Sequence, residues 1–232
     1  MRIAAITLSG VIGFCAHAGD LSRATDQLPE LADPPEGQAQ WIAKSMKVNG
    51  LPMTLKAFES AMDPLALLHH YERWFRGLGA LESRVSRNGD RHILAIKHQR
   101  YFATIQAQPS TRGSVGTMTV SANPATVVAQ LDTKFPVLKG LRIINLQQYE
   151  DLGVEAEHIS LVSSRAAHVD ATSYEQLLTK HGWQIVRQQA TRATLGGQLV
   201  EAQRGAEHAL LTFLPDRTRT SATAIVIVWR KA

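Results

Sequence analysis

The chain has 232 residues, of which 44% are hydrophobic and 19% are charged, and its formal net charge is +5. This composition can bury a core, so it excludes a chain that is disordered throughout. The length allows two small domains or one large one. The single cysteine, Cys15, lies in the N-terminal apolar stretch, so a mature chain without that stretch has no disulfide, thiolate metal site or cysteine nucleophile.

Residues 1–18 have the pattern of a signal peptide. Arg2 supplies a basic start, an apolar run follows to Cys15, and Ala16-His17-Ala18 has the form that signal peptidase cleaves. The run is shorter than the ~20 residues that a membrane-spanning helix needs. We therefore expect export and cleavage, with a retained anchor as the alternative. A mature exported chain without cysteine is typical of a bacterial periplasmic or secreted protein.

Residues 19–40 are predicted to form a flexible, proline-containing acidic linker. The segment has five acidic residues, three prolines and one basic residue, Arg23, so its net charge is −4. Such a composition cannot form a core. We expect no transmembrane span after signal cleavage, because no later segment is long and apolar enough.

Residues 41–121 are predicted to form a first α+β unit. Two strand-like runs flank Asn49-Gly50, the strongest short-range signal for a type I′ hairpin turn. A helix follows over Asp63–Gly79, with Asp63 as its cap, Pro64 in its first turn and one apolar stripe. Three or four strands complete a ββαβββ-like unit, an antiparallel sheet with the helix on one face. The candidate strands are Leu81–Ser86, His92–His98, Tyr101–Gln108 and Thr117–Ser121.

Residues 122–140 are predicted to be a connector with a short helix, for which Asn123 is the cap and Pro124 the first residue. The pattern of the first unit then returns in residues 141–232. A hairpin precedes a helix that Asp170 or Thr172 could cap and that Gly182 ends, with Trp183 placed for a Schellman motif. The strands Gln184–Gln188, Leu199–Gln203, His208–Leu214 and Ala222–Trp229 complete the second unit.

The spacing of shared features favours an internal repeat. The dipeptides Tyr71-Glu72 and Tyr174-Glu175 lie 103 residues apart, and the intervals around them differ by only a few residues. The alternative is two unrelated α+β units of similar size. The charge of the two units differs, because residues 41–121 hold 11 basic and 5 acidic residues whereas residues 141–232 hold 10 and 9.

No motif in the chain predicts catalysis, a metal or a cofactor. The adjacent His69 and His70 point about 100° apart on a helix, and no H-E-x-x-H motif occurs. The cluster Ser163, His168 and Asp170 lacks a nucleophile elbow, so we interpret it as a strand end and a helix cap. The acidic residues Glu150, Asp151, Glu155 and Glu157 are interpreted as a solvated hairpin tip rather than a carboxylate pair for hydrolysis.

A basic sheet face is the one candidate binding site. If Met53, Leu55 and Ala57 face the helix, alternation places the lysine between them on the opposite face. The same reasoning applied to the next strands collects four bases on the face that the helix leaves uncovered: Lys56, Arg84, Arg91 and Lys97. Such a face could dock an anionic envelope component, and its alternative is an ordinary solvated surface.

The sequence thus favours a non-enzymatic periplasmic interaction or assembly module, such as an accessory part of a secretion or pilus machine. Its partner would be another envelope protein. One alternative is a binding module for an anionic envelope ligand through the basic face, and another is a hydrolase whose site the sequence does not reveal. Export argues against a nucleic-acid partner.

Overall fold

The computed structural model describes residues 21, 24–126, 130–151, 153–191, 196–215 and 222–231. The predicted signal peptide, residues 1–18, lies outside the described residues. The described chain is an α+β structure built on one twelve-stranded antiparallel sheet with two helices. None of its helices is long and apolar enough to cross a bilayer.

Each half of the chain contributes six strands and one helix in the same order. The first half comprises β1 (Gly37–Val48), β2 (Leu51–Ser60), α2 (Pro64–Gly77), β3 (Glu82–Asn88), β4 (Arg91–Lys97), β5 (Tyr101–Ser110) and β6 (Gly113–Ala122). The second half comprises β7 (Arg142–Asp151), β8 (Val154–Ser163), α3 (Ala167–Lys180), β9 (Gln184–Ala190), β10 (Gln198–Arg204), β11 (Glu207–Pro215) and β12 (Thr223–Lys231). Four strands follow each helix, so the four candidate strands of each unit are present and the notation ββαβββ is one strand short.

The strand order of the second half mirrors that of the first. The sheet runs β3-β4-β5-β6-β2-β1-β7-β8-β12-β11-β10-β9, so equivalent strands lie at equal distances from its centre. The two halves meet where β1 pairs antiparallel with β7 over Ser45–Val48 only. Asn49 adds two hydrogen bonds there: its N–H donates to the Leu146 carbonyl oxygen (2.7 Å), and its Oδ1 accepts from the Leu146 N–H (2.8 Å).

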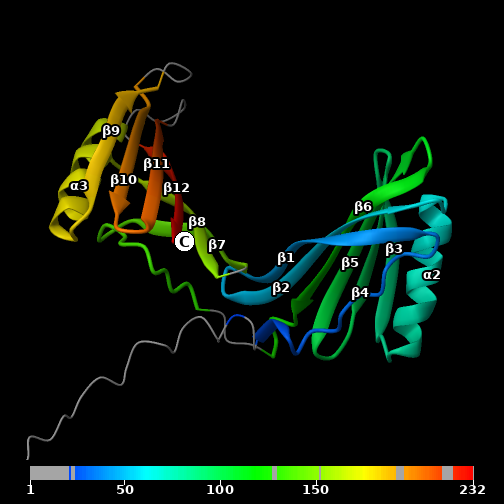
Figure 1. Ribbon diagram of the computed structural model, residues 1–232. Helices are drawn as coiled ribbons and strands as arrows, with labels where there is room; N and C mark the ends of the chain where they lie inside the picture. Colours follow the sequence, from blue (N-terminus) through cyan, green and yellow to red (C-terminus); the bar gives the residue numbers. More distant parts are fainter. Residues whose placement is uncertain are drawn as a thin grey trace, which may run out of the picture.

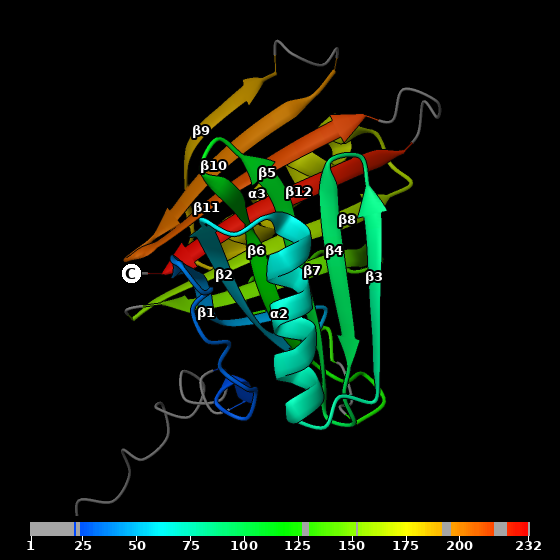
Figure 2. The same ribbon diagram turned by 90° about the vertical axis from the view of Figure 1, so that its right-hand side faces the viewer.

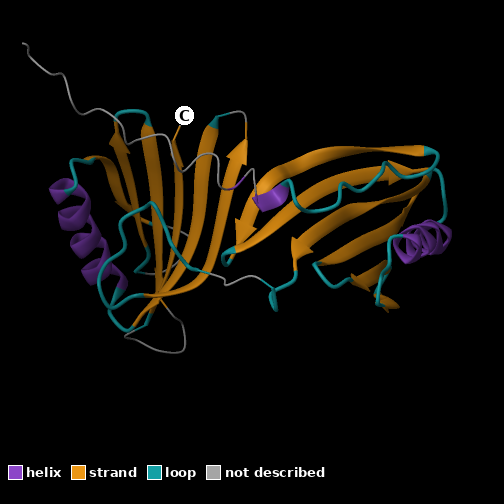
Figure 3. Cartoon of the chain, turned by 90° about the horizontal axis from the view of Figure 1, so that it is seen from below, coloured by secondary structure: helices purple, strands orange, loops and turns teal. Residues whose placement is uncertain are grey.

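The helices lie at the two outer sides of the molecule. In Figure 1, α2 is at one end and α3 at the other, with the sheet bent between them. Seen from the α2 end, the strands of the first half lie directly behind that helix and those of the second half lie behind them (Figure 2). The view from below gives the same arrangement (Figure 3). The faces of the two half-sheets that carry no helix are therefore turned toward each other.

Local sequence signals account for the main turns and helix ends. Asn49 and Gly50 have positive φ values of 51° and 80°, as a type I′ turn requires. The Asp63 carboxylate accepts hydrogen bonds from the N–H groups of Leu65 and Ala66. At the end of α3, the N–H of Trp183 donates to the Leu178 carbonyl oxygen at 2.9 Å, which confirms the predicted Schellman motif.

The predicted cap of the second helix is wrong. Helix α3 begins at Ala167, and neither Asp170 nor Thr172 caps it. Asp170 is fully buried in the first turn, where its carboxylate forms an ion pair with Arg165 at 2.5 Å. The Thr172 hydroxyl donates to the His168 carbonyl oxygen. Asp170 still favours the helix through its charge near the N-terminus.

Each half has its own core between its helix and its sheet. Helix α2 packs on β4 and β5, and α3 packs on β9, β10 and β11. Tyr71 and Tyr174 occupy the same place in the two helices and are 1% and 0% exposed. Burial raises the pKa of both phenols. The largest fully buried side chains include Phe75, Leu94 and Ile105 in the first core and Phe135, Leu146 and Phe213 in the second.

The linker predicted over residues 19–40 is wrong for residues 28–40, because residues 28–36 lie against the first half and β1 begins at Gly37. Leu31 is only 4% exposed and Leu28 packs on the same core, so this arm, residues 28–36, covers part of the first half. The Tyr71 hydroxyl donates to the Ala32 carbonyl oxygen at 2.8 Å, and the Ser60 hydroxyl donates to that of Pro35 at 2.8 Å. Two leucines three residues apart fasten this otherwise polar segment.

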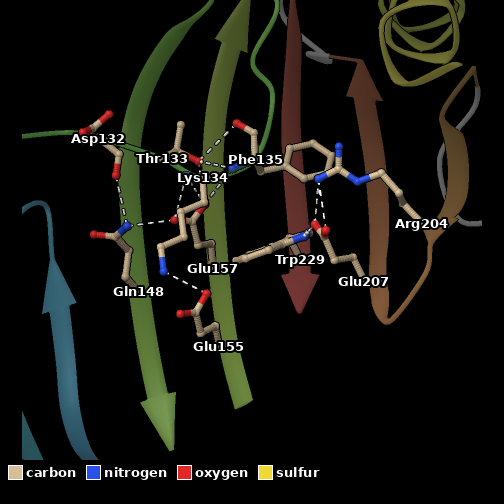
Figure 4. A network of polar contacts seen from close by, with 10 residues as sticks. All are labelled: Asp132, Thr133, Lys134, Phe135, Gln148, Glu155, Glu157, Arg204, Glu207 and Trp229. Carbon is tan, nitrogen blue, oxygen red and sulfur yellow. Dashed lines mark hydrogen bonds and ion pairs between the residues drawn. The ribbon is translucent and has the colours of Figure 1, made fainter. Parts of the chain in front are cut away.

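The connector contains a second arm, residues 132–138, in the corresponding place before β7. Phe135 is buried in the second core. Glu157, which is 2% exposed, accepts hydrogen bonds from the Thr133 hydroxyl (2.5 Å) and from the backbone N–H groups of Lys134 (3.0 Å) and Phe135 (3.3 Å). Figure 4 shows this network. Asn123 caps a turn over residues 124–126 through the Ala125 N–H, and the middle of the predicted short helix, residues 127–129, lies outside the described residues.

Candidate interaction faces

Three of the four predicted basic residues lie on the uncovered face of the first half. In β3 and β4, Val85 pairs with the buried Leu94, so the neighbouring Arg84 points to the opposite face. Lys97 forms an ion pair with Glu82 at 2.9 Å, which neutralises it. Arg91 donates to the Gln106 side-chain oxygen at 3.2 Å. Of the predicted bases on this face, Arg84 and Arg91 are therefore the two without an ion pair in the described residues.

Lys56 lies on the other face, which corrects the sequence prediction. Its side chain is 8% exposed and its Nζ lies 2.9 Å from the Leu31 carbonyl oxygen, 3.2 Å from Glu30 and 3.8 Å from Asp33. It also lies 4.4 Å from the centre of the Trp41 ring. The two faces of β2 are exchanged relative to the prediction, because Phe58, the largest apolar side chain of that strand, packs in the core. Lys56 lies two residues before Phe58 and therefore points to the same face. Lys56 thus holds the first arm against the sheet through these contacts.

The uncovered face of the first half is polar at its centre. On β5 and β6, Thr104 lies opposite Thr119, and Gln106 lies opposite Thr117. All four side chains are half-buried by their neighbours on the sheet. A hollow of about 300 Å³ lies beside them, lined by Gln38, Gln40, Ala57, Glu59 and Val115 among others. The centre of this surface presents hydroxyl and amide groups, with the half-buried Leu55 and Ile93 beside them on β2 and β4.

The uncovered face of the second half is apolar at the matching positions. On β11 and β12, Leu210 lies opposite Val228, and Thr212 lies opposite Val226. Leu210 and Val226 are each 38% exposed although they are large and apolar. By strand pairing, Leu210 and Val228 replace Thr104 and Thr119 of the first half, and Val226 replaces Thr117.

A second hollow of about 610 Å³ lies at one end of this apolar surface. Its lining includes Arg142, Val162, Ser164, Leu214 and Ala224. Val162 and Ala224 are opposite each other on β8 and β12, as Glu59 and Val115 are on β2 and β6. The two hollows therefore occupy equivalent places in the two halves, but Val162 stands where the first half has Glu59.

In the described residues, the side chains that the sequence offered for catalysis form hydrogen bonds and ion pairs that support the fold. Glu157 holds the second arm, and Glu155 forms an ion pair with Lys134 at 2.8 Å, so the acidic residues are not all a solvated hairpin tip. Burial raises the pKa of Glu150, and the nearby Glu155 adds to the effect. Ser163 accepts a hydrogen bond from the Arg165 N–H. Within the described ranges, no three His, Cys, Asp or Glu side chains lie close enough to hold a metal ion.

Sequence reasoning missed the apolar uncovered face. The signal was present in Ala224–Trp229, where apolar residues run without a polar alternate. Such a run predicts a strand that is apolar on both faces. One face is explained by the core, and the exposed Val226 and half-buried Val228 make up the other.

Comparisons with known proteins give no assignment: no family model, no curated protein and no solved structure matches this chain.

Proposed function

We propose that this protein is an exported, non-enzymatic interaction or assembly module built from two copies of one ββαββββ unit. Its partner is another protein of the cell envelope, and the uncovered faces of the sheet receive it. The periplasmic setting follows from the signal-peptide pattern of residues 1–18. The duplication is supported by the identical element order and by the spacing of 103 residues that β2 and β8, and likewise α2 and α3, share.

The observation that carries the proposal is the exposed apolar side chains on a sheet face that no helix covers. Helices α2 and α3 each cover one side of their half-sheet, and the other side holds Leu210 and Val226 in contact with solvent. Large apolar groups gathered on one side of a sheet typically mark a protein-binding surface.

The alternative of an anionic ligand on the basic face has weaker support. Lys56 binds the first arm on the other face, and Lys97 is neutralised by its ion pair with Glu82, so neither contributes free positive charge to the basic face. Arg84 and Arg91 alone leave a small positive area, and a small number of surface charges gives little affinity at physiological salt.

Site-specific photo-crosslinking in the periplasm of the producing bacterium tests the proposal. A photoreactive amino acid is placed singly at Thr104 and Leu210 on the uncovered faces and, as matched controls, at the exposed His69 and His168 on α2 and α3. We expect a discrete adduct from at least one uncovered-face position and from neither helix position. Adducts at the helices alone, or at none of the four positions, would contradict the proposed function.

A further inference from the structure

We propose that the uncovered face of the second half is a docking strip for an extended segment of a partner protein, apolar in its middle and acidic at both ends. The strip consists of Leu210, Val226, Val228 and the hollow at Val162, Leu214 and Ala224. The inference rests on the proposed function and specifies which half binds and what it binds.

The strip is continuous along β12. Residues Ala224, Val226 and Val228 follow each other on one face of this strand, because alternate residues of a strand point the same way. Leu214 and Leu210 flank it from β11, opposite Ala224 and Val228. Val162 flanks it from β8, opposite Ala224. The apolar surface thus has the long, narrow form of a strand rather than that of a round pocket.

An arginine lies near each end of the strip, Arg142 two strands to the side on β7 and Arg230 on β12 itself. Arg142 lies opposite Val162 and lines the hollow. Arg230 follows Val228 on the same face of β12, opposite His208. Both arginines are exposed, and neither has an ion-pair partner in the described part of the chain. Elsewhere in the second half, Arg187 lies opposite Glu201 in the strand pairing and donates to the Gln189 side-chain oxygen.

The two arginines determine which charge the terminal residues of the bound segment should carry. Carboxylates at both ends of an apolar stretch would meet Arg142 and Arg230, whereas a basic segment would be repelled at both. The six-residue interval from Ala224 to Arg230 spans about 20 Å in a strand. A seven-residue extended segment with acidic first and last residues and apolar third and fifth residues therefore fits the strip.

The arrangement of the halves favours a slender occupant over a membrane surface. The strip is turned toward the other half of the molecule rather than outward (Figures 1 and 2). A flat bilayer is kept from this face by the other half of the molecule, while an extended chain can enter between the two halves. The second half also lacks the carboxylate that the first half has at Glu59, so the hollow at Val162 accepts an acidic chain end without repulsion.

Defined peptides test the inference on the purified full chain. The probe is a capped peptide Asp-Thr-Leu-Thr-Leu-Thr-Asp, with Lys-for-Asp and Thr-for-Leu versions as controls. Binding is followed by the methyl NMR signals of Leu210, Val226 and Val228. We expect saturable shifts with the first peptide at up to about 1 mM and none with the two controls.

Two sets of variants locate the binding. Leu210→Thr with Val226→Thr copies residues that the first half carries at matched positions, so the fold is retained and binding weakens about tenfold or more. Thr104→Ser with Thr117→Ser, the matched control, leaves binding unchanged. Arg142→Asp with Arg230→Asp should exchange the preference, so that the Lys-ended peptide binds and the Asp-ended peptide does not.

The inference is overturned if the Asp-ended peptide produces no shift, if the Leu210→Thr/Val226→Thr variant binds it as well as the wild type, or if the charge exchange does not reverse the preference. Binding to vesicles of anionic phospholipid through the same methyl groups also overturns it, in favour of a membrane ligand. The proposed function would survive each result if photo-crosslinks from Thr104 on the first half persist.

Discussion

The two halves of this sheet have one topology and two surface chemistries. Their strand orders mirror each other, and their helices are fourteen residues each. On the helix-covered face both halves place apolar residues, for example Ile105 and Leu211, each fully buried. On the uncovered face Thr104 and Thr117 stand against Leu210 and Val226. The comparison teaches that the core face fixes the fold, while the other face is free to take on separate tasks.

In each half, a buried charged side chain binds the arm that precedes the sheet, and the charge is positive in the first half and negative in the second. In β2, the Lys56 ammonium holds the first arm through the Leu31 carbonyl oxygen and two carboxylates. In β8, two residues before the matching position, Ile159, the Glu157 carboxylate holds the second arm through backbone N–H groups. A buried charge is tolerated in both cases because the arm supplies its partners.

The largest expected effect comes from placing the lysine of one half in the other. Ile159 is 0% exposed and matches Lys56, but its partners on the neighbouring strands, Leu146 and Ile227, are apolar. The Glu157 carboxylate, two residues away on the same face, is already bonded to the second arm. Ile159→Lys should lower the free energy of unfolding by about 4 kcal/mol or more. Urea denaturation measures the loss. The reciprocal Lys56→Ile should cost much less, because the matched half already accepts isoleucine, and equal losses in both would break the comparison.

Glu157→Ala should have the next largest effect. The change leaves the N–H groups of Lys134 and Phe135 without their acceptor, so we expect a loss of about 3 kcal/mol. Hydrogen exchange of residues 133–135 should rise with it. Thr54→Ala, at the matching position of β2, is the control and should cost less than about 1 kcal/mol. A small loss at Glu157 would show that packing of Phe135 alone holds the second arm.

The free energy of unfolding should decrease at alkaline pH because each half contains a buried tyrosine. An unfolded tyrosine titrates near pH 10, and burial raises the pKa of Tyr71 and Tyr174 above that value. Above about pH 10 the unfolded chain releases protons that the folded chain retains, so stability is complete below that pH and falls as the pH rises. The urea midpoint should therefore decrease from pH 9 to pH 11. Tyr71→Phe with Tyr174→Phe should make the decrease shallower.

The smallest effect is expected at Arg84. This side chain is exposed on the uncovered face and forms no ion pair in the described residues, so Arg84→Glu should change the free energy of unfolding by less than about 0.5 kcal/mol. It should also leave the docking of the acidic peptide on the second half unchanged. Weaker peptide binding in this variant would place the ligand on the first half instead.

Much of the fold could be predicted from the sequence because its signals are local. Asn49-Gly50 dictates a hairpin turn, and Asp63-Pro64 starts a helix whatever lies around it. For β6 the sequence predicts only Thr117–Ser121, because Gly113–Ala122 is rich in small residues with weak periodicity. The sequence does not predict the first arm, because two leucines in an acidic, proline-containing segment form no periodic pattern. The contacts that hold the arm come from Lys56 and the first core, which are distant in sequence.

The candidate face could be predicted only in part, because the assignment of faces depends on which alternate set of a strand enters the core. In β2 both sets contain apolar residues, and the choice of Met53, Leu55 and Ala57 over Phe58 inverted the strand. In β4 both sets contain apolar residues, but only Leu94 and Ile96 are buried, and Arg84, Arg91 and Lys97 lie on the opposite face, as alternation predicts. The apolar strip depends on neighbours from three strands, which spacing along one strand does not reveal.

The antiparallel pairing of β1 with β7 has one more consequence. A single unit made without its twin would leave the backbone of Ser45–Val48 unpaired at a bare sheet edge. Its simplest remedy would be to pair with another molecule of itself, in a dimer whose two faces are necessarily alike. Covalent joining of the two units removes that constraint, so one polypeptide can carry a threonine surface and a leucine–valine surface where a homodimer could carry only one kind.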